Sequence, residues 1–134
     1  NAALDLNLRA PFLMSQRAAR RMTAGGLIVN ITDVGARKTW SAYPAYTVSK
    51  AALESLTRVL ARALAPDIRV NAVAPGLVLP AADMSPEAWQ ILTEKMPLRR
   101  TARPEEIAAA LDFLLDNHFV TGETITVDGG YSLI

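Results

Sequence analysis

The stretch of sequence that decides the fold is residues 27–50, LIVNITDVGARKTWSAYPAYTVSK. Its apolar, β-branched beginning, Leu27–Ile31, is typical of a strand buried in a parallel sheet. A polar loop leaves this strand, and Pro44 suits the first turn of a helix. We expect the helix to continue to about Leu64, because its apolar residues recur at helical spacing and Pro66 then ends it.

The rest of the chain continues this alternation of strands and helices. The apolar pattern and the positions of proline and glycine predict further helices over 8–22, 85–95 and from 104 onward, and strands over 68–74 and 124–127. Strands that alternate with helices are typical of a parallel sheet covered on its faces by helices. The sequence therefore predicts an α/β fold, and its 134 residues have the length of about one modest domain.

A carboxylate, a phenol and an ammonium lie close together in this stretch. Asp33 precedes Tyr46 by thirteen positions, and Lys50 follows Tyr46 by four, so the last two share one helix face. An ammonium beside a phenol favours the phenolate and lowers the tyrosine pKa from its usual ~10. Asp33 also follows the carboxyl end of a predicted strand, where doubly wound sheets bind ligands. We therefore predict a catalytic site in which Tyr46 donates a proton.

The composition excludes several classes of function. Fourteen basic and 13 acidic residues give a net charge of +1, which offers no electrostatic basis for binding nucleic acid or an anionic membrane. The chain has no cysteine and a single histidine, His118, so we expect neither a disulfide nor a metal site. Because the sequence has no apolar run of membrane-spanning length and no secretory signal at its beginning, we expect a cytoplasmic protein.

These motifs resemble the C-terminal half of a short-chain dehydrogenase/reductase. The family's tyrosine-x-x-x-lysine motif stands here as YTVSK, residues 46–50. Family members usually have a serine thirteen residues before the tyrosine; Asp33 takes that place here, as an aspartate does in pteridine reductases. The ending DGGYSL, residues 128–133, also resembles that subfamily. The resemblance covers nearly the whole chain and implies a Rossmann-like, doubly wound parallel sheet, of which this chain would form the C-terminal part.

The same resemblance implies roles for individual residues. Lys50 would hydrogen-bond the nicotinamide ribose in addition to its effect on Tyr46. Asn7 matches an asparagine that supports a water-mediated proton path to the lysine. The residues whose backbone would meet the nicotinamide carboxamide are Pro75, Gly76, Leu77 and Val78, and those that would border the substrate beside Asp33 and Tyr46 are Leu79 and Trp40.

Asp33 decides which bond such an enzyme would reduce. An ionised carboxylate would repel the oxygen of a ketone, which gains negative charge as hydride arrives. A protonated Asp33 can instead donate to a ring nitrogen, so a C=N bond is the better substrate. By resemblance we expect NADPH-dependent reduction of pterins, with dihydrofolate as a further substrate. Two alternatives stay open: an alcohol or ketone dehydrogenase in which Asp33 is a tolerated variant, and a degenerate relative that binds without turnover.

A dinucleotide-binding sheet needs a glycine-rich turn to hold the pyrophosphate, and this sequence has none. The family carries that turn in its N-terminal half. Either residues 1–134 are the C-terminal portion of one domain, or the protein has lost its cofactor cradle, and we expect the first. The resemblance further implies a homotetramer with two kinds of two-fold contact between identical subunits. One kind would involve the helices around 8–22 and 46–64, and the other would involve the last strand and the tail.

Overall fold

The computed structural model describes residues 1–38 and 40–134 and contains a three-stranded parallel sheet. The strands are β1 (Gly26–Ile31), β2 (Ile68–Pro75) and β3 (Thr124–Val127). β2 lies in the middle, where Gly26 of β1 is opposite Ile68 and Thr124 of β3 is opposite Ala72. The parallel sheet predicted from the alternation of strands and helices is confirmed.

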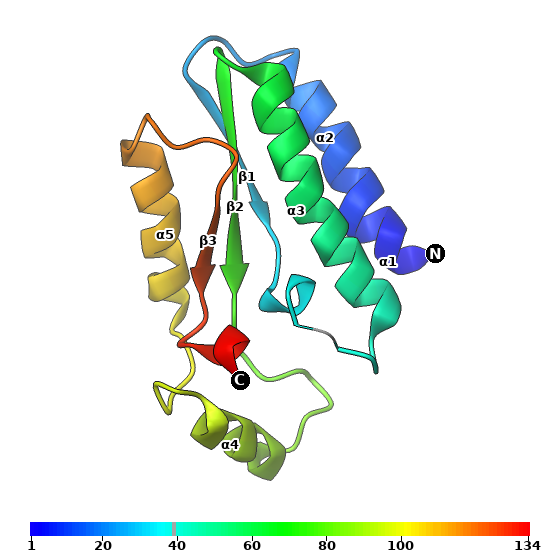
Figure 1. Ribbon diagram of the computed structural model, residues 1–134, viewed down its shortest axis with the longest axis vertical. Helices are drawn as coiled ribbons and strands as arrows, with labels where there is room; N and C mark the ends of the chain where they lie inside the picture. The colour runs from blue at the N-terminus through cyan, green and yellow to red at the C-terminus, as the bar shows by residue number, and fades with distance from the viewer. Residues whose placement is uncertain (39) are drawn as a thin grey trace.

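Helices cover both faces of the sheet (Figure 1). They are α3 (Pro44–Leu64) on one face and α5 (Pro104–Asp116) on the other. Leu60 of α3 shares a buried cluster with Val70 of β2, and Leu114 of α5 shares another with Val73. Val70 and Val73 face different helices because side chains alternate along a strand. Helices on both faces of a parallel sheet make the fold doubly wound, as predicted.

The first helical segment begins earlier than the apolar pattern predicted. Instead of one helix over 8–22, it consists of α1 (Ala2–Leu4), a π-helical segment η1 (Asp5–Arg9) and α2 (Ala10–Ala19). Asn1 caps it, since its side chain accepts a hydrogen bond from the Ala3 amide. Within η1 the N–H of Ala10 donates to the carbonyl of Asp5, an i→i+5 bond that widens the helix. α2 runs beside α3 in both views of the ribbon.

The later helices begin and end where proline and polar caps predicted. α3 begins at Pro44 and ends at Leu64, and α4 runs over Pro86–Lys95. Ser85 caps α4 by accepting a hydrogen bond from the Ala88 amide at 3.2 Å. Within residues 1–38 and 40–134, no helix is both long and apolar enough to cross a membrane.

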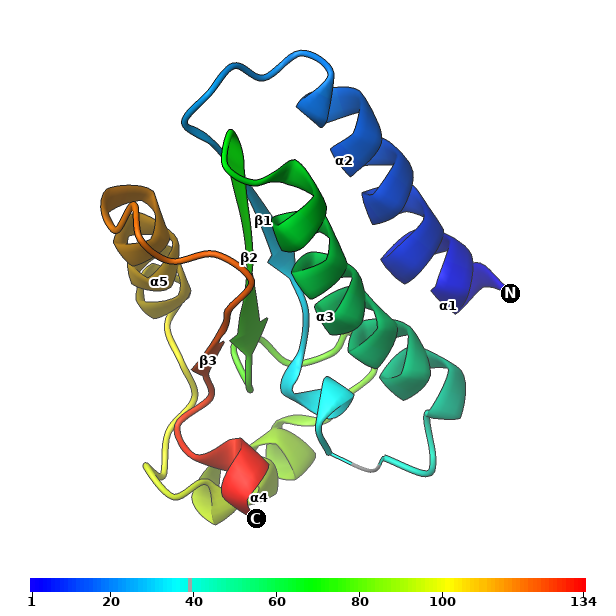
Figure 2. The ribbon, with the colours of Figure 1, turned by 45° about the horizontal axis from the view of Figure 1, so that its top comes forward.

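Loops and short helices gather at the carboxyl ends of the strands. η2 (Val34–Ala36) follows β1, α4 follows β2, and η3 (Tyr131–Leu133) follows β3. Figure 2 shows all three on the side toward which the strand arrows point. Gly129 and Gly130 have φ values of 60° and 85°, which glycine adopts without strain, so the chain turns sharply from β3 into η3. A parallel α/β sheet binds its ligands at this end.

Candidate active site

Asp33 and Tyr46 are hydrogen-bonded to each other. Tyr46 Oη donates to Asp33 Oδ2 at 2.9 Å, and Asp33 Oδ1 accepts from the backbone N–H of Gly35 at 2.6 Å. Asp33 lies in extended backbone just before η2, and Tyr46 lies in the first turn of α3. Strand, loop and helix therefore bring together two side chains that are thirteen positions apart in the sequence. Their catalytic role stays a prediction.

The pKa of Tyr46 moves in the direction opposite to the sequence expectation. Burial of the phenol raises its pKa, and the charge of Asp33 and the hydrogen bond to it raise the pKa further. Lys50 Nζ lies 5.8 Å from the centroid of the Tyr46 ring and donates to the carbonyl of Ile31 at 3.1 Å instead. The expectation that the tyrosine pKa is lowered is therefore wrong for this structure, because burial, followed by the charge of Asp33 and the hydrogen bond to it, raises that pKa.

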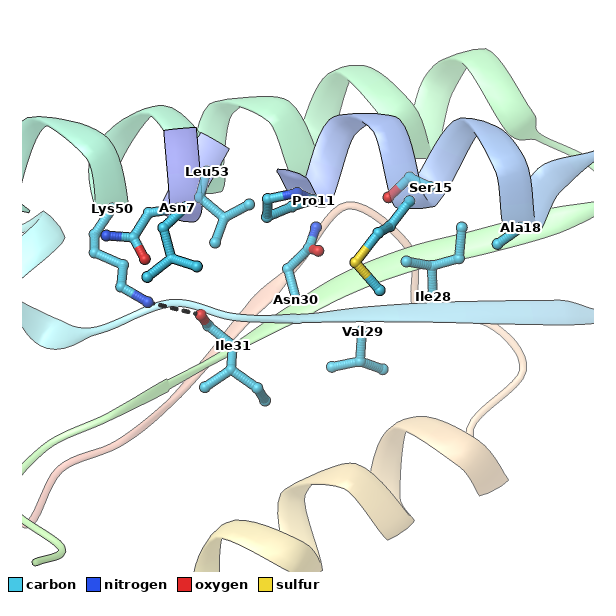
Figure 3. A pocket seen from close by; sticks show the side chains of 12 residues that line it. Asn7, Pro11, Ser15, Ala18, Ile28, Val29, Asn30, Ile31, Lys50 and Leu53 are labelled. Atoms are coloured by element: carbon cyan, nitrogen blue, oxygen red, sulfur yellow. Dashed lines mark hydrogen bonds between the residues drawn. The ribbon is translucent and has the colours of Figure 1, made fainter. Parts of the chain in front are cut away.

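Lys50 lies one turn after Tyr46 and reaches the end of β1, where its ammonium donates to the carbonyl of Ile31 (Figure 3). Burial lowers the pKa of Lys50, while the charge of Asp33 acts in the opposite direction. An ammonium has three donors, and only this one is engaged in the described part of the chain. Two donors are thus left for a ligand with hydroxyl groups.

Asn7 lies within η1 and is fixed against α3. Its Nδ2 donates to Ser49 Oγ at 3.0 Å, and Ser49 Oγ donates to the carbonyl of Tyr46 at 2.7 Å. Ser49 is completely buried. The amide of Asn7 is therefore coupled to the helical turn that carries Tyr46 and Lys50. π-Helical segments are rare and are frequent at functional sites.

A groove of about 410 Å³ lies between α2 and β1 (Figure 3). Asn7 and Lys50 lie at one end of it, and Ile28 and Asn30 point toward α2 from the strand. β1 is an outer strand of the sheet, and among the described residues no strand pairs with its outer edge. The groove thus connects the lysine to the open edge of the sheet.

The segment Pro75–Val78 leaves the carboxyl end of β2, and part of its backbone is already engaged within the fold. The N–H of Gly76 donates to a carbonyl of β3 at 3.0 Å, and the carbonyl of Leu77 accepts from Ala102 at 2.8 Å. The N–H groups of Leu77 and Val78 have no partner within the ranges 1–38 and 40–134. These two N–H groups are therefore available for the predicted backbone contact with a cofactor, which stays a prediction.

The two residues predicted to border the substrate lie in different surroundings. The ring of Trp40 packs over Gly35, so closely that a Cβ on Gly35 would lie 2.7 Å from Trp40 Cζ3. Trp40 therefore covers the turn that holds Asp33. Leu79 lies in the loop between β2 and α4 and is 73% exposed. The contact of Leu79 with a substrate stays a prediction.

Sequence reasoning missed Gly35 and Ser49. Gly35 supplies the amide that holds Asp33, in the two-residue spacing by which an aspartate bonds its own backbone in a turn. Ser49 shares the helical spacing of the buried residues Leu53 and Leu60. A polar residue on a buried helix face needs a partner, and this signal could have pointed to Asn7.

The sequence matches a family model described as enoyl-(acyl carrier protein) reductase over residues 1–132. It is 37% identical to an NAD-dependent glycerol dehydrogenase of Listeria innocua, over 97% of this chain and 54% of that protein. It is 33% identical to a dihydromonapterin reductase of Citrobacter koseri, over 97% of this chain and 56% of that protein. The chain thus spans about half the length of the curated relatives it matches.

The fold is also that of solved structures. One is the FolM alternative dihydrofolate reductase 1 from Brucella canis, complexed with NADP, which is 35% identical to this chain with a TM-score of 0.91. The match covers 98% of this chain and 54% of that one. The family model, the relatives and the solved structure agree on one family, and the chain belongs to the short-chain dehydrogenase/reductase family.

Proposed function

We propose that this chain is the C-terminal portion of a domain that reduces a C=N bond of a pterin, with NADPH as the hydride donor. The observation that carries the proposal is the hydrogen bond from Tyr46 Oη to Asp33 Oδ2. A carboxyl group, rather than a neutral hydroxyl, therefore adjoins the proton donor. The names of two relatives support the same chemistry, a dihydromonapterin reductase and an alternative dihydrofolate reductase complexed with NADP.

The charge of Asp33 discriminates between the two kinds of bond. Reduction of a ketone builds negative charge on oxygen, and an ionised Asp33 would repel it. Reduction of a C=N bond adds hydride to carbon and a proton to nitrogen, which leaves a neutral N–H. Tyr46 or Asp33 gives up that proton, and the hydrogen-bonded pair regains one from solvent. The pair is therefore suited to a ring nitrogen.

The residues present fit a nicotinamide cofactor, which supplies the hydride when bound. The two unused donors of Lys50 suit the hydroxyl groups of a ribose. The amides of Leu77 and Val78, which have no partner among the described residues, lie at the carboxyl end of β2 and suit a carboxamide. Asn7, fixed through Ser49, holds the helical turn on which Lys50 lies.

The open edge of β1 supports the proposal that a further part of the domain covers it. Ile31 of β1 is 46% exposed, and an apolar, unpaired edge strand invites association. The relatives are about twice as long as this chain. The intact mass of the protein purified from its source tests this point. A mass well above 14.4 kDa would support it, and a mass of 14.4 kDa would contradict it.

We also propose that the whole protein assembles as a homotetramer. Leu13 of α2 and Val59 of α3 are 44% and 61% exposed, on the two neighbouring helices. Apolar side chains on outer helix faces favour association of identical subunits. Light scattering should give four times the mass of one subunit, and the mass of a monomer would contradict the proposal.

The reaction itself is tested by NADPH oxidation with dihydrobiopterin, dihydrofolate and a panel of ketones, using the full-length protein. Loss of one group that stabilises the transition state costs ~10²–10³ in kcat, so Asp33→Ser should lower pterin turnover by about that factor. Tyr46→Phe is the control that should impair any reaction of this site.

The outcomes of this assay distinguish pterin reduction from the two alternative functions. Ketone turnover that survives Asp33→Ser would overturn pterin reduction and favour the second candidate, an alcohol or ketone dehydrogenase. The similarity to a glycerol dehydrogenase is the observation that favours that candidate. Absence of turnover on every substrate would favour a relative that binds without catalysis.

A further inference from the structure

The end of the chain lies against the loop that follows β1. Figures 1 and 2 both show η3 beside η2, at the carboxyl ends of the strands, and the two segments are in contact. Lys38 Nζ donates to the carbonyl of Tyr131 at 2.8 Å and to the carbonyl of Ile134. The same Nζ lies 4.2 Å from the centroid of the Tyr131 ring, within the range of a cation–π contact. One side chain thus fastens the C-terminal turn by three interactions.

A continuous series of contacts leads from this fastening point to Asp33. The Tyr131 ring lies 6.2 Å from the Trp40 ring, tilted by 49°. Trp40 packs on Gly35, and the amide of Gly35 donates to Asp33 Oδ1. Burial raises the pKa of Tyr131, and the charge of Asp33 raises it further.

The C-terminal turn, residues 128–134, is held in place by hydrogen bonds and close packing. Both oxygens of Asp128 accept backbone hydrogen bonds, from Gly130 at 3.0 Å and from Ser132 at 2.7 Å. Gly76 packs against the backbone of Asp128, where an added Cβ would lie 2.8 Å from Asp128 Cα. The turn is therefore anchored to the segment after β2 as well as to the loop after β1.

We propose that Lys38 is a positioning residue for Asp33, acting through Tyr131 and Trp40. The cation holds the Tyr131 ring against Trp40, and Trp40 in turn closes the Gly35 turn on the carboxylate. Lys38 does not contact the Asp33–Tyr46 pair, so its effect is on geometry and not on proton transfer. This inference rests on the proposed role of Asp33 and is independent of which substrate is reduced.

Kinetics of the full-length protein test the proposal with three variants. Lys38→Met removes the cation and keeps the side-chain length, whereas Lys38→Arg keeps the cation. Lys95→Met is the matched control, because Lys95 lines the same hollow beside Tyr131 but makes no hydrogen bond or ion pair in the described residues. Displacement of a reacting group by ~1 Å can cost ~10²-fold, so Lys38→Met should lower kcat about tenfold with KM for NADPH nearly unchanged. Lys38→Arg should recover most of this loss.

A second readout does not depend on turnover. In protein labelled with ¹⁵N-glycine, the Gly35 amide should resonate far downfield because it donates to a carboxylate, and Asp33→Asn should identify it. Lys38→Met should shift this resonance, and Lys95→Met should leave it in place. If Lys38→Met has the same kcat and the same Gly35 resonance as the parent protein, the proposal is overturned. If the parent protein reduces no substrate, the proposed function fails, and the Gly35 resonance alone decides whether Lys38 positions Asp33.

Discussion

Replacing Gly35 with alanine should impair both stability and catalysis. Gly35 does not require glycine for its backbone, because its φ is not positive. Its need for glycine is one of space. A Cβ there would lie 2.7 Å from Trp40 Cζ3 and 2.9 Å from Asp33 Oδ1, between the ring and the carboxylate. Neither side chain can move away without losing a contact, because Trp40 packs against Tyr131 and Asp33 accepts a hydrogen bond from Tyr46.

The size of the effect follows from two opposing contributions. Alanine restricts the unfolded chain, which at a compatible site stabilises a protein by ~0.4–1 kcal/mol. An extra carbon in a filled space costs ~1–3 kcal/mol. We therefore expect Gly35→Ala to lower the free energy of unfolding by about 1–2 kcal/mol. Because Asp33 must move away from the new methyl group, we also expect kcat to fall by ~10- to 100-fold.

Gly26→Ala is the matched control. A Cβ on Gly26 would also come within 2.8 Å of another atom, but that atom is Cε of Met22, the free end of a flexible side chain. This variant should stay within ~0.5 kcal/mol of the parent and keep its kcat. Equilibrium urea denaturation at one protein concentration and steady-state kinetics measure both quantities. A Gly35→Ala protein as stable and as active as Gly26→Ala would refute the steric argument.

Other regions of the molecule give three further predictions. Arg37→Ala removes the partner of the buried Glu54 carboxylate, with which Arg37 forms an ion pair at 3.4 Å. Urea denaturation should therefore show a free energy of unfolding lower by about 1–2 kcal/mol. A second change, Glu54→Gln, should restore part of this loss because it removes the unpaired charge. Because the pKa of Tyr46 is raised in the folded state, it contributes stability that is present below pH ~10 and is lost as the pH rises through the folded-state pKa. Asp33→Ser should therefore shift the pH at which the tyrosinate absorbance of Tyr46 appears to a lower value. The absorbance of Tyr46 is identified by its loss in Tyr46→Phe. Hydrogen bonds from the Arg100 side chain and the Arg103 backbone hold the pKa of Glu106 at about 2, so a carboxyl NMR titration should find it there and find it higher in Arg100→Ala.

The arrangement of strands and helices could be predicted from the sequence because local signals determine it. Apolar runs such as Leu27–Ile31 and breakers such as Pro44 and Pro66 act within a few residues. The meeting of Asp33 with Tyr46 also follows from local order, since strand, loop and helix lie in sequence. Local sequence signals are therefore sufficient to predict these parts of the fold and the site.

Contacts between distant residues could not be predicted in the same way. The hydrogen bond of Asn7 to Ser49 joins residues 42 positions apart, and it goes with a π-helical turn that periodicity does not indicate. The direction of the Lys50 side chain depends on the carbonyl of Ile31, 19 positions away. The raised pKa of Tyr46 follows first from its burial and then from the charge of Asp33 and the hydrogen bond to it, and a spacing of four residues predicts neither.

The widened turn at η1 has a genetic consequence. Because Ala10 bonds to Asp5 rather than to Leu6, this turn contains one residue more than an ordinary helix. Leu6 is 71% exposed, so deleting its codon would remove little packing and would let the helix close with i→i+4 bonds. The helix downstream would keep its place, while the bulge that directs Asn7 toward Ser49 would be gone. A single inserted codon can thus create this polar contact, and a single lost codon can erase it.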